Sequence, residues 1–392
     1  MNGGLDEEVR ALIEREAAPL PDAEREALRE RVLRLATGLG PLEPLLADPS
    51  VDEVMVNGPQ AVYVERRGRL ERAGVSFACE AELMHAIERV LAPLGRRVDE
   101  AAPLCDARLA DGSCVNVVIP PLSLSGPCLT IRRFRHAGFS LRELVEGGTL
   151  TPELGELLAM CVAARASVLV SGGTGCGKTT TLNALSGAIP GEERIVTIED
   201  AAELRLRQRH VVRLEARPSN LEGRGEVTIR QLVRNALRMR PDRIVIGEVR
   251  GAEALDMLQA LNTGHDGSLT TVHANSPGDA VRRLETLALM AGIGLPAQAV
   301  REQLAGALDL IVQQARLKDG SRRIIAVTEV QGMEGDVIVM QSVFEFEQTG
   351  IKNGKIVGRM RPTGIRPKFV EKFEAANIYL PPNIFGAMDR FF

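Results

Sequence analysis

A glycine-rich turn near the middle of the chain constrains the fold more than any other feature. Residues 171–180 read Ser-Gly-Gly-Thr-Gly-Cys-Gly-Lys-Thr-Thr, and the spacing Gly172-x4-Gly177-Lys178-Thr179 is that of a phosphate-binding loop. An apolar, β-branched run precedes the turn, and a helix-compatible run follows it. A strand, a tight turn and a helix in this order predict an α/β unit built around the loop.

The chemistry of this loop predicts a nucleoside triphosphate ligand. Its glycines let successive backbone N–H groups turn toward an anion, and the following helix points its positive end at the same place. Lys178 supplies a mobile charge for the outer phosphates, and Thr179 supplies a hydroxyl for Mg²⁺. The alternative is a glycine-rich turn that binds nothing. The residues expected to bind nucleotide are Gly172, Gly173, Thr174, Gly175, Cys176, Gly177, Lys178, Thr179 and Thr180.

Bulk properties limit the classes of protein that fit. A chain of 392 residues is too long for one ordinary core and predicts two or three domains. The net charge of −4 gives no global reason to expect a nucleic-acid binder. No apolar run is long enough for a bilayer span, and the acidic N-terminus is unlike a secretory signal, so we expect a cytoplasmic protein. The six cysteines show no paired metal-ligand spacing, which favours reduced thiols.

The pattern of apolar residues changes twice along the chain. Residues 1–50 contain two acidic, amphipathic helical segments, 6–18 and 22–37. Residues 51–142 carry short strands, punctuated by Asn-Gly and Asp-Gly turns, and one helix, which predicts a small α+β domain. From residue 143 helices and apolar strands alternate, which predicts a mostly parallel sheet, with a C-terminal extension of hairpins from about 330. The expected strands are 51–57, 61–66, 115–119, 129–134, 168–170, 195–198, 243–246 and 269–272, and the expected helices beyond residue 50 are 80–94, 229–238, 252–262 and 279–290.

Acidic side chains follow two of the expected buried strands. Hydrolysis of a bound nucleotide needs a carboxylate at the end of a neighbouring strand to position or activate water. Glu248 follows the run Arg-Ile-Val-Ile-Gly, and Glu199 and Asp200 follow Ile-Val-Thr-Ile. We expect one strand end to supply water activation and the other to support Mg²⁺. The alternative for these acids is helix capping or a surface position.

A histidine-containing segment follows at residues 263–275. Strand alternation over 268–273 would bring His273 to the sheet edge where the other strands end. A neutral imidazole there can donate to a phosphate oxygen and so report the presence of the γ-phosphate. A zinc site is disfavoured because no cysteine or further histidine is close in sequence. A purely structural role is the alternative for both His265 and His273.

These segments together resemble a known family. The loop at 172–179, the acidic box at 197–200, the strand end at 246–251 and the histidine box at 264–275 come in the order of the type II/type IV secretion ATPase superfamily. The chain looks like the tight-adherence branch of that superfamily, the CpaF/TadA-type pilus ATPases. The sequence segments that resemble this branch are residues 54–59, 95–99, 106–109, 119–121, 129–134 and 329–336.

The resemblance implies an architecture and an activity. It implies a RecA-like P-loop ATPase domain preceded by a small α+β domain and a short helical unit, assembled as a hexameric ring. ATP and Mg²⁺ are the implied cofactors. The implied function is ATP hydrolysis that drives assembly or retraction of a tight-adherence pilus through inner-membrane platform proteins, with the ATPase peripheral to the membrane. The alternative is the ATPase of a type IV or type II secretion machine.

Residue roles also follow from the resemblance. An arginine from the small domain counters transition-state charge in such sites; Arg132 is the first candidate and Arg133 the second, and a solvated strand face is the alternative. The other implied roles are phosphate and Mg²⁺ binding by Lys178 and Thr179, polarisation of water by Glu248, support of metal or water by Glu199, and phosphate sensing by His273.

Two cysteines depart from the family pattern. Cys114 stands where the family usually has an arginine, which leaves Arg132 or Arg108 to supply the missing charge. Cys176 replaces a serine inside the loop; nucleotide binding should survive because that position contributes its backbone N–H, and the thiol is expected to be redox-sensitive.

Two other classes of protein fit the sequence less well. No Asn-Lys-x-Asp segment supports a GTPase, and 3% aromatic residues with an acidic balance disfavour a translocase that stacks single-stranded DNA.

Overall fold

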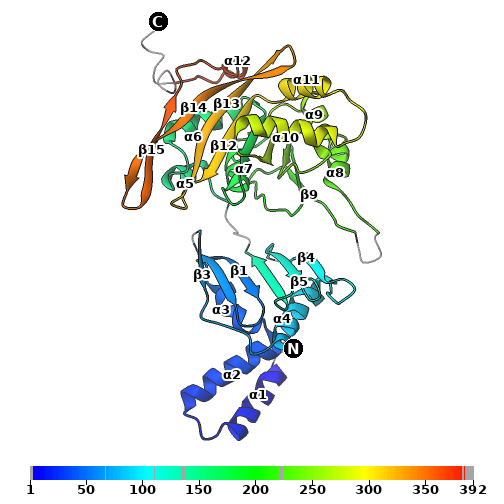
Figure 1. The fold of residues 1–392 in the computed structure, drawn as a ribbon, viewed down its shortest axis with the longest axis vertical. Helices are drawn as coiled ribbons and strands as arrows, with labels where there is room; N and C mark the ends of the chain where they lie inside the picture. The colour runs from blue at the N-terminus through cyan, green and yellow to red at the C-terminus, as the bar shows by residue number, and fades with distance from the viewer. Residues whose placement is uncertain are drawn as a thin grey trace. The chain divides into compact units, whose positions relative to one another are not determined.

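The computed structural model describes residues 3–66, 68–109, 111–133, 138–219, 224–381 and 384. The chain forms two compact units, Met1–Arg135 and His136–Phe392. Each unit has its own sheet, as Figure 1 shows. One large apolar core lies in unit 1 and two lie in unit 2. Phe134, the last residue of one expected strand, lies outside the described residues.

Unit 1 combines two N-terminal helices with a six-stranded antiparallel sheet. Helices α1 (Gly3–Glu16) and α2 (Asp22–Thr37) pack on each other, followed by the short helix α3 (Glu43–Ala47). The sheet order is β3-β2-β1-β6-β5-β4, and helix α4 (Glu80–Leu91) buries its apolar residues against one face. The strands are β1 (Val51–Asn57), β2 (Val62–Arg66), β3 (Arg69–Arg72), β4 (Leu104–Arg108), β5 (Cys114–Val118) and β6 (Cys128–Arg132).

Unit 2 is built on a nine-stranded sheet with the order β15-β14-β13-β12-β7-β11-β10-β8-β9. The six strands from β12 to β9 run parallel to their neighbours, and β13, β14 and β15 add to β12 in antiparallel fashion. The sheet is therefore mixed. The strands are β7 (Val168–Gly172), β8 (Ile195–Glu199), β9 (Val211–Glu215), β10 (Arg243–Ile246), β11 (Leu269–His273), β12 (Leu310–Arg316), β13 (Arg322–Glu334), β14 (Val337–Lys352) and β15 (Lys355–Pro362).

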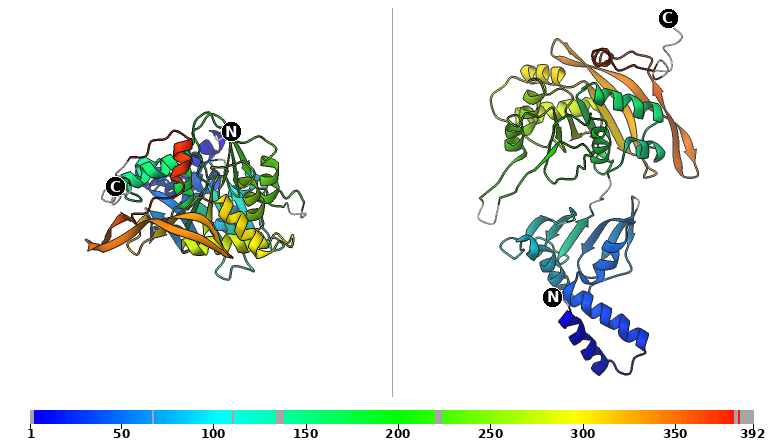
Figure 2. Two further views of the ribbon diagram at one scale, coloured as in Figure 1. Left: turned by 90° about the horizontal axis from the view of Figure 1, so that it is seen from above. Right: turned by 180° about the vertical axis from the view of Figure 1, so that it is seen from behind.

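The expected C-terminal hairpins are present, and they extend the central sheet. Strand β12 lies parallel to β7, and the chain reverses after it so that β13 pairs with β12 in antiparallel fashion. Strands β14 and β15 continue the meander, visible in orange in Figures 1 and 2. The short helix α12 (Val370–Ala375) then packs into the same core as β7.

Helices cover both faces of the large sheet because its central strands are apolar on both sides. Alternate residues of β7 point to opposite faces: Val168 and Val170 enter one core, and Leu169 enters the other. The first core contains α5 (Leu141–Glu146), α6 (Pro152–Ala163), α7 (Lys178–Ser186) and α12. The second contains α8 (Ile229–Ala236), α9 (Glu253–Leu261), α10 (Pro277–Leu289) and α11 (Ala297–Ala307). Figure 2 shows these helices from two further directions.

Local signals fix where several helices begin. Helix α10 begins at Pro277, two residues before its predicted start, because Ser276 accepts a hydrogen bond from the N–H of Asp279 and proline suits the first helical position. Helix α5 begins after a capping box made by Ser140 and Glu143. Among the described residues, no helix is both long enough and apolar enough to span a bilayer.

Candidate functional site

The phosphate-binding loop connects the end of β7 to the start of α7. Gly175 and Gly177 have φ angles of 69° and 101°, in the left-handed region that glycine adopts at low cost. A Cβ placed on Gly172 would lie 2.4 Å from the carbonyl oxygen of Gln314 and 2.5 Å from Sγ of Cys176. Gly172, Gly175 and Gly177 are therefore required by the turn or by close packing, and the loop presents its backbone N–H groups at the start of α7.

The side chain of Lys178 lies against this loop and is buried, with 7% of the residue exposed. Its Nζ donates to the carbonyl of Gly173 at 3.1 Å and lies 3.2 Å from Nε2 of His273. His273 is the last residue of β11, and its backbone pairs with Gly172 at the end of β7. The structure thus brings the predicted lysine and the predicted histidine together beside the loop.

Glu248 lies one residue beyond Gly247, which follows β10, and completes this group. Its Oε1 is 2.9 Å from Nε2 of His273, and its Oε2 accepts a hydrogen bond from Nη2 of Arg250 at 2.8 Å. Arg250 also lies 3.6 Å from the carboxylate of Asp200. The carboxylate of Glu248 is therefore held from two sides by donors, with 19% of its side chain still exposed.

The pKa of His273 is lowered, mainly by burial. The nearby negative charge of Glu248 opposes this effect, and the positive charges of Lys178 and Arg250 lower the pKa further. The imidazole is therefore neutral at neutral pH, and one of its two nitrogens carries the hydrogen. A neutral histidine beside Lys178 can donate to an anion without adding a second full charge.

Glu199 ends β8 on the next strand of the sheet and is only 2% exposed. Its Oε1 accepts hydrogen bonds from the N–H groups of Glu203 and Leu204, both at 2.8 Å, whereas its buried Oε2 has no hydrogen-bond partner among the described residues. Burial raises the pKa of Glu199 to about 7 against the opposing effect of those two backbone donors. A Cβ on Gly247 would lie 2.9 Å from Cγ of Glu199, so only glycine fits there.

The oxygen donors at this sheet edge fit Mg²⁺ in part. Thr179 lies in the first turn of α7, next to Lys178, where its hydroxyl can serve as one ligand. The unpartnered Oε2 of Glu199 is a buried oxygen that can accept a hydrogen bond from a metal-bound water. Among the described residues, no three His, Cys, Asp or Glu side chains group into a metal site. Most ligands would therefore come from nucleotide phosphates and water.

Sequence reasoning missed a third set of residues, on the other side of β7. Oγ1 of Thr181 in α7 donates to Oε1 of Gln314 in β12 at 2.8 Å, and both side chains are buried. A Cβ on Gly175 would lie 3.8 Å from Nη1 of Arg316, and one on Gly177 would lie 3.5 Å from Cδ of Arg322. No sequence signal marked these residues, because their proximity depends on β12 lying beside β7.

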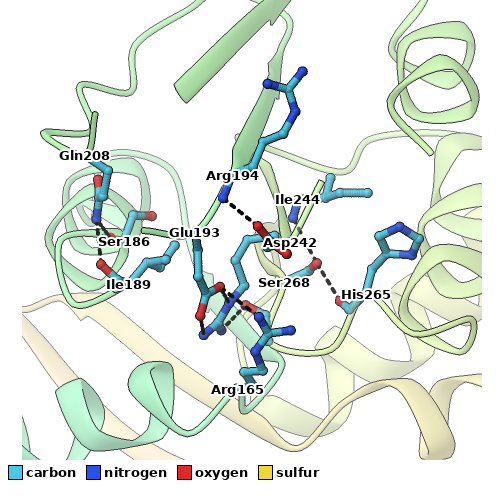
Figure 3. Close-up of polar contacts among 12 residues, drawn as sticks. Arg165, Ser186, Ile189, Glu193, Arg194, Gln208, Asp242, Ile244, His265 and Ser268 are labelled. Atoms are coloured by element: carbon cyan, nitrogen blue, oxygen red, sulfur yellow. Dashed lines mark hydrogen bonds and ion pairs between the residues drawn. The ribbon is translucent and has the colours of Figure 1, made fainter. Parts of the chain in front are cut away.

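His265 lies at the end of β11 that is remote from the loop. Its Nδ1 is 3.2 Å from a carbonyl oxygen at the end of α9, and its own carbonyl accepts a hydrogen bond from Ser268 (Figure 3). Nearby, the guanidinium of the fully buried Arg243 pairs with Glu193 at 2.6 Å, and Arg165 contacts the same carboxylate at 3.3 Å. This group anchors the starts of β10 and β11 and takes no part in the loop's chemistry.

The candidate arginines of unit 1 differ in their surroundings. Arg132 is exposed on β6, opposite Cys114 on β5, and Cys114 is in turn opposite Arg108 on β4. Facing residues of adjacent strands lie on one face, so Cys114 stands between two arginines on the face away from α4. Arg133 is engaged differently, since its Nη1 donates to the carbonyl of Val51 at 3.2 Å.

Cys176 is buried within the loop and is 1% exposed. Burial raises the pKa of its thiol against the nearby charges of Lys178 and Arg322, which lower it. Because the thiolate is the reactive form, the buried thiol is poorly reactive. The structure thus argues against the redox sensitivity expected from the sequence.

Comparison with known proteins shows to which family this chain belongs. The family described as Type II/IV secretion system protein matches residues 35–356. A putative conjugal transfer protein of Mycobacterium tuberculosis is 46% identical over 307 residues, covering 77% of this chain and 87% of the relative. The type IV secretion system protein PtlH of Bordetella pertussis is 36% identical over 72% of this chain and 91% of its own. The conjugal transfer protein TrbB of Rhizobium radiobacter is 34% identical over 73% and 86%.

Solved structures support the fold. The ATPase DotB of Yersinia pseudotuberculosis has a TM-score of 0.52 at 19% identity, covering 73% of this chain and 76% of that chain. The pilus retraction motor PilT with bound ADP has a TM-score of 0.51 at 22% identity, covering 71% and 78%. These similarities confirm the predicted α/β fold.

The loop, the acids at neighbouring strand ends and the fold together define a P-loop ATPase. The chain belongs to the type II/IV secretion system protein family, and the predicted ATP hydrolase activity is confirmed. Nucleotide binding follows from the same membership.

Proposed function

We propose that this protein is the ATP-driven motor of a type IV secretion or conjugal transfer machine. The observation that carries the catalytic part is the convergence of three side chains beside the loop: Nε2 of His273 lies 3.2 Å from Nζ of Lys178 and 2.9 Å from Oε1 of Glu248. Support for the kind of machine comes from relatives named as conjugal transfer and type IV secretion proteins, each covering more than two thirds of both chains.

The proposed chemistry assigns each group a task. Lys178 leaves the carbonyl of Gly173 for the phosphates. Thr179 would help hold Mg²⁺, whose charge would polarise the phosphate oxygens. Glu248 orients a water that attacks the γ-phosphorus; the bond to the bridging oxygen breaks, and the electron pair leaves on ADP. His273 donates to the γ-phosphate when it is present, and Glu199 accepts a hydrogen bond from water at the same edge.

We also propose a hexameric assembly. Family ATPases form hexamers, and exposed Arg132 is the proposed charge that completes each site, with Arg133 as the second candidate. Sedimentation with a non-hydrolysable ATP analogue should show a hexamer. A protein that stays monomeric at high concentration would contradict this assembly.

A second candidate is the pilus motor of the tight-adherence branch. This candidate is supported by the sequence segments 54–59 and 329–336, which resemble that branch. The two candidates differ in the partner, which would be a secretion channel in one case and inner-membrane platform proteins in the other.

One experiment separates the candidates. The natural host would carry a Glu248→Gln allele, and we would measure DNA or protein transfer and, in parallel, surface filaments. Loss of transfer with intact filaments supports the proposed function. Loss of filaments with intact transfer supports the pilus motor. Full retention of both would contradict both candidates.

A further inference from the structure

We propose that Arg316 and Arg322 bind the nucleotide at its α-phosphate end, on the side of the loop opposite to Glu248. This inference rests on the proposed binding of ATP at the loop. The two arginines form a second set of contacts to the same nucleotide. It concerns two residues of the C-terminal half of the sheet to which the sequence assigned no role.

The order of the strands gives the direction of the bound nucleotide. The loop follows β7, and the strands that carry His273 and Glu248 lie on one side of it, in the order β11 and then β10. Strands β12 and β13 lie on its other side. If the γ-phosphate faces Glu248, the α-phosphate and the nucleoside extend toward β12 and β13.

A buried hydrogen bond fixes β12 against the loop. The amide oxygen of Gln314 accepts from Thr181, which turns the amide nitrogen toward the loop, 3.1 Å from where a Cβ of Gly177 would lie. The carbonyl of Gln314 also packs closely on Gly172. Side chains two residues apart on a strand share a face, so Arg316 emerges on the same side as Gln314, where the loop lies.

The two arginines are exposed and face each other across the turn. Arg316 and Arg322 are direct partners in the register of β12 and β13. Arg322 is also close enough to the loop for its charge to lower the pKa of Cys176. A guanidinium suits phosphate because its fork of N–H donors matches two phosphate oxygens.

The test compares ligands that share different parts of the nucleotide. ADP contains the α-phosphate and the nucleoside, whereas inorganic phosphate offers the loop a single phosphate and lacks both. The double variant Arg316→Ala, Arg322→Ala should bind ADP roughly 30-fold more weakly, because bonds to charged groups are lost. Its binding of inorganic phosphate should change by less than about twofold, and in turnover assays the loss should fall on the KM for ATP.

The turn between β12 and β13 provides a matched control. Lys318 is exposed there, between the two arginines in sequence, and Lys318→Ala removes one positive charge. That control should bind ADP as the natural protein does. Equal weakening of ADP and inorganic phosphate, or unchanged binding of ADP, would overturn the proposal. If the natural protein itself fails to bind ADP, the proposed function fails instead.

Discussion

The two sides of the P-loop strand β7 differ in what their residues do and in how they are held. On the β11 and β10 side, His273 and Glu248 are partly buried and bonded to each other and to neighbouring charges. On the β12 and β13 side, Arg316 and Arg322 are exposed, and the buried Gln314 amide beside them is bonded to Thr181. A site for breaking a bond needs groups fixed in position, which fits the buried side, whereas an exposed pair of guanidinium groups suits the holding of an anion.

Lys178 lies between the two sides, so its loss should affect both binding and turnover. Lys178→Ala should weaken ATP binding and reduce turnover by roughly 1,000-fold, because a buried donor for the phosphates is removed. Titration with a fluorescent ATP analogue and an assay of phosphate release would measure these effects, with Lys318→Ala as control. Undiminished ATP binding would show that the ammonium does not reach the phosphates.

Glu199 should make stability depend on pH. Its pKa is raised from the ordinary value of 4.5 to about 7, so between these values the native state holds a proton that the unfolded state releases. The free energy of unfolding therefore falls as pH rises through this window, by about 3 kcal/mol from this group. Urea denaturation with a chelator present should show this decline in the natural protein relative to Glu199→Gln. Parallel pH curves would contradict it.

Arg250 should act through Glu248 rather than on the nucleotide. Its guanidinium holds one oxygen of that carboxylate at 2.8 Å, so Arg250→Gln should lower kcat about tenfold and leave KM for ATP nearly unchanged. Arg250→Lys should recover part of the loss. Arg282→Gln, which removes an exposed ion pair on α10, is the matched control. A change confined to KM would place Arg250 on the binding side instead.

The smallest effect is expected at Cys176. Cys176→Ser should change ATP affinity by less than about twofold, because this position contributes its backbone N–H to the loop. The buried thiol, with its raised pKa, should react with iodoacetamide more slowly than the exposed Cys79. Mass spectrometry of partially alkylated protein gives the order of reaction. Faster labelling of Cys176 would mean that the loop opens readily.

The catalytic side could be predicted from the sequence because each group follows a recognisable strand. Glu248 comes just after an apolar run, and parallel strands deliver their ends to one edge of the sheet. The binding side could not be predicted. Arg316 lies near the loop only because β12 pairs with β7, and Arg322 lies opposite Arg316 because the chain turns back from β12 into β13. The pairing of β12 with β7 joins distant parts of the chain, and no local pattern encodes it.

The same limit explains two other differences. The tail was expected as hairpins without a stated place in the sheet, since alternation indicates strands but not which strand they join. Arg250 was not singled out, because a lone arginine in a sequence gives no sign of the carboxylate it will hold.

The most direct test of the division between the two sides measures kcat and the dissociation constant for ATP in two variants. In Glu248→Gln, kcat should fall by at least about 100-fold while ATP binding is retained, because only water activation is lost. In the Arg316→Ala, Arg322→Ala variant, the dissociation constant should rise and carry most of the loss. If both variants change the same constant to the same extent, the two sides do not have separate tasks, and the account is wrong.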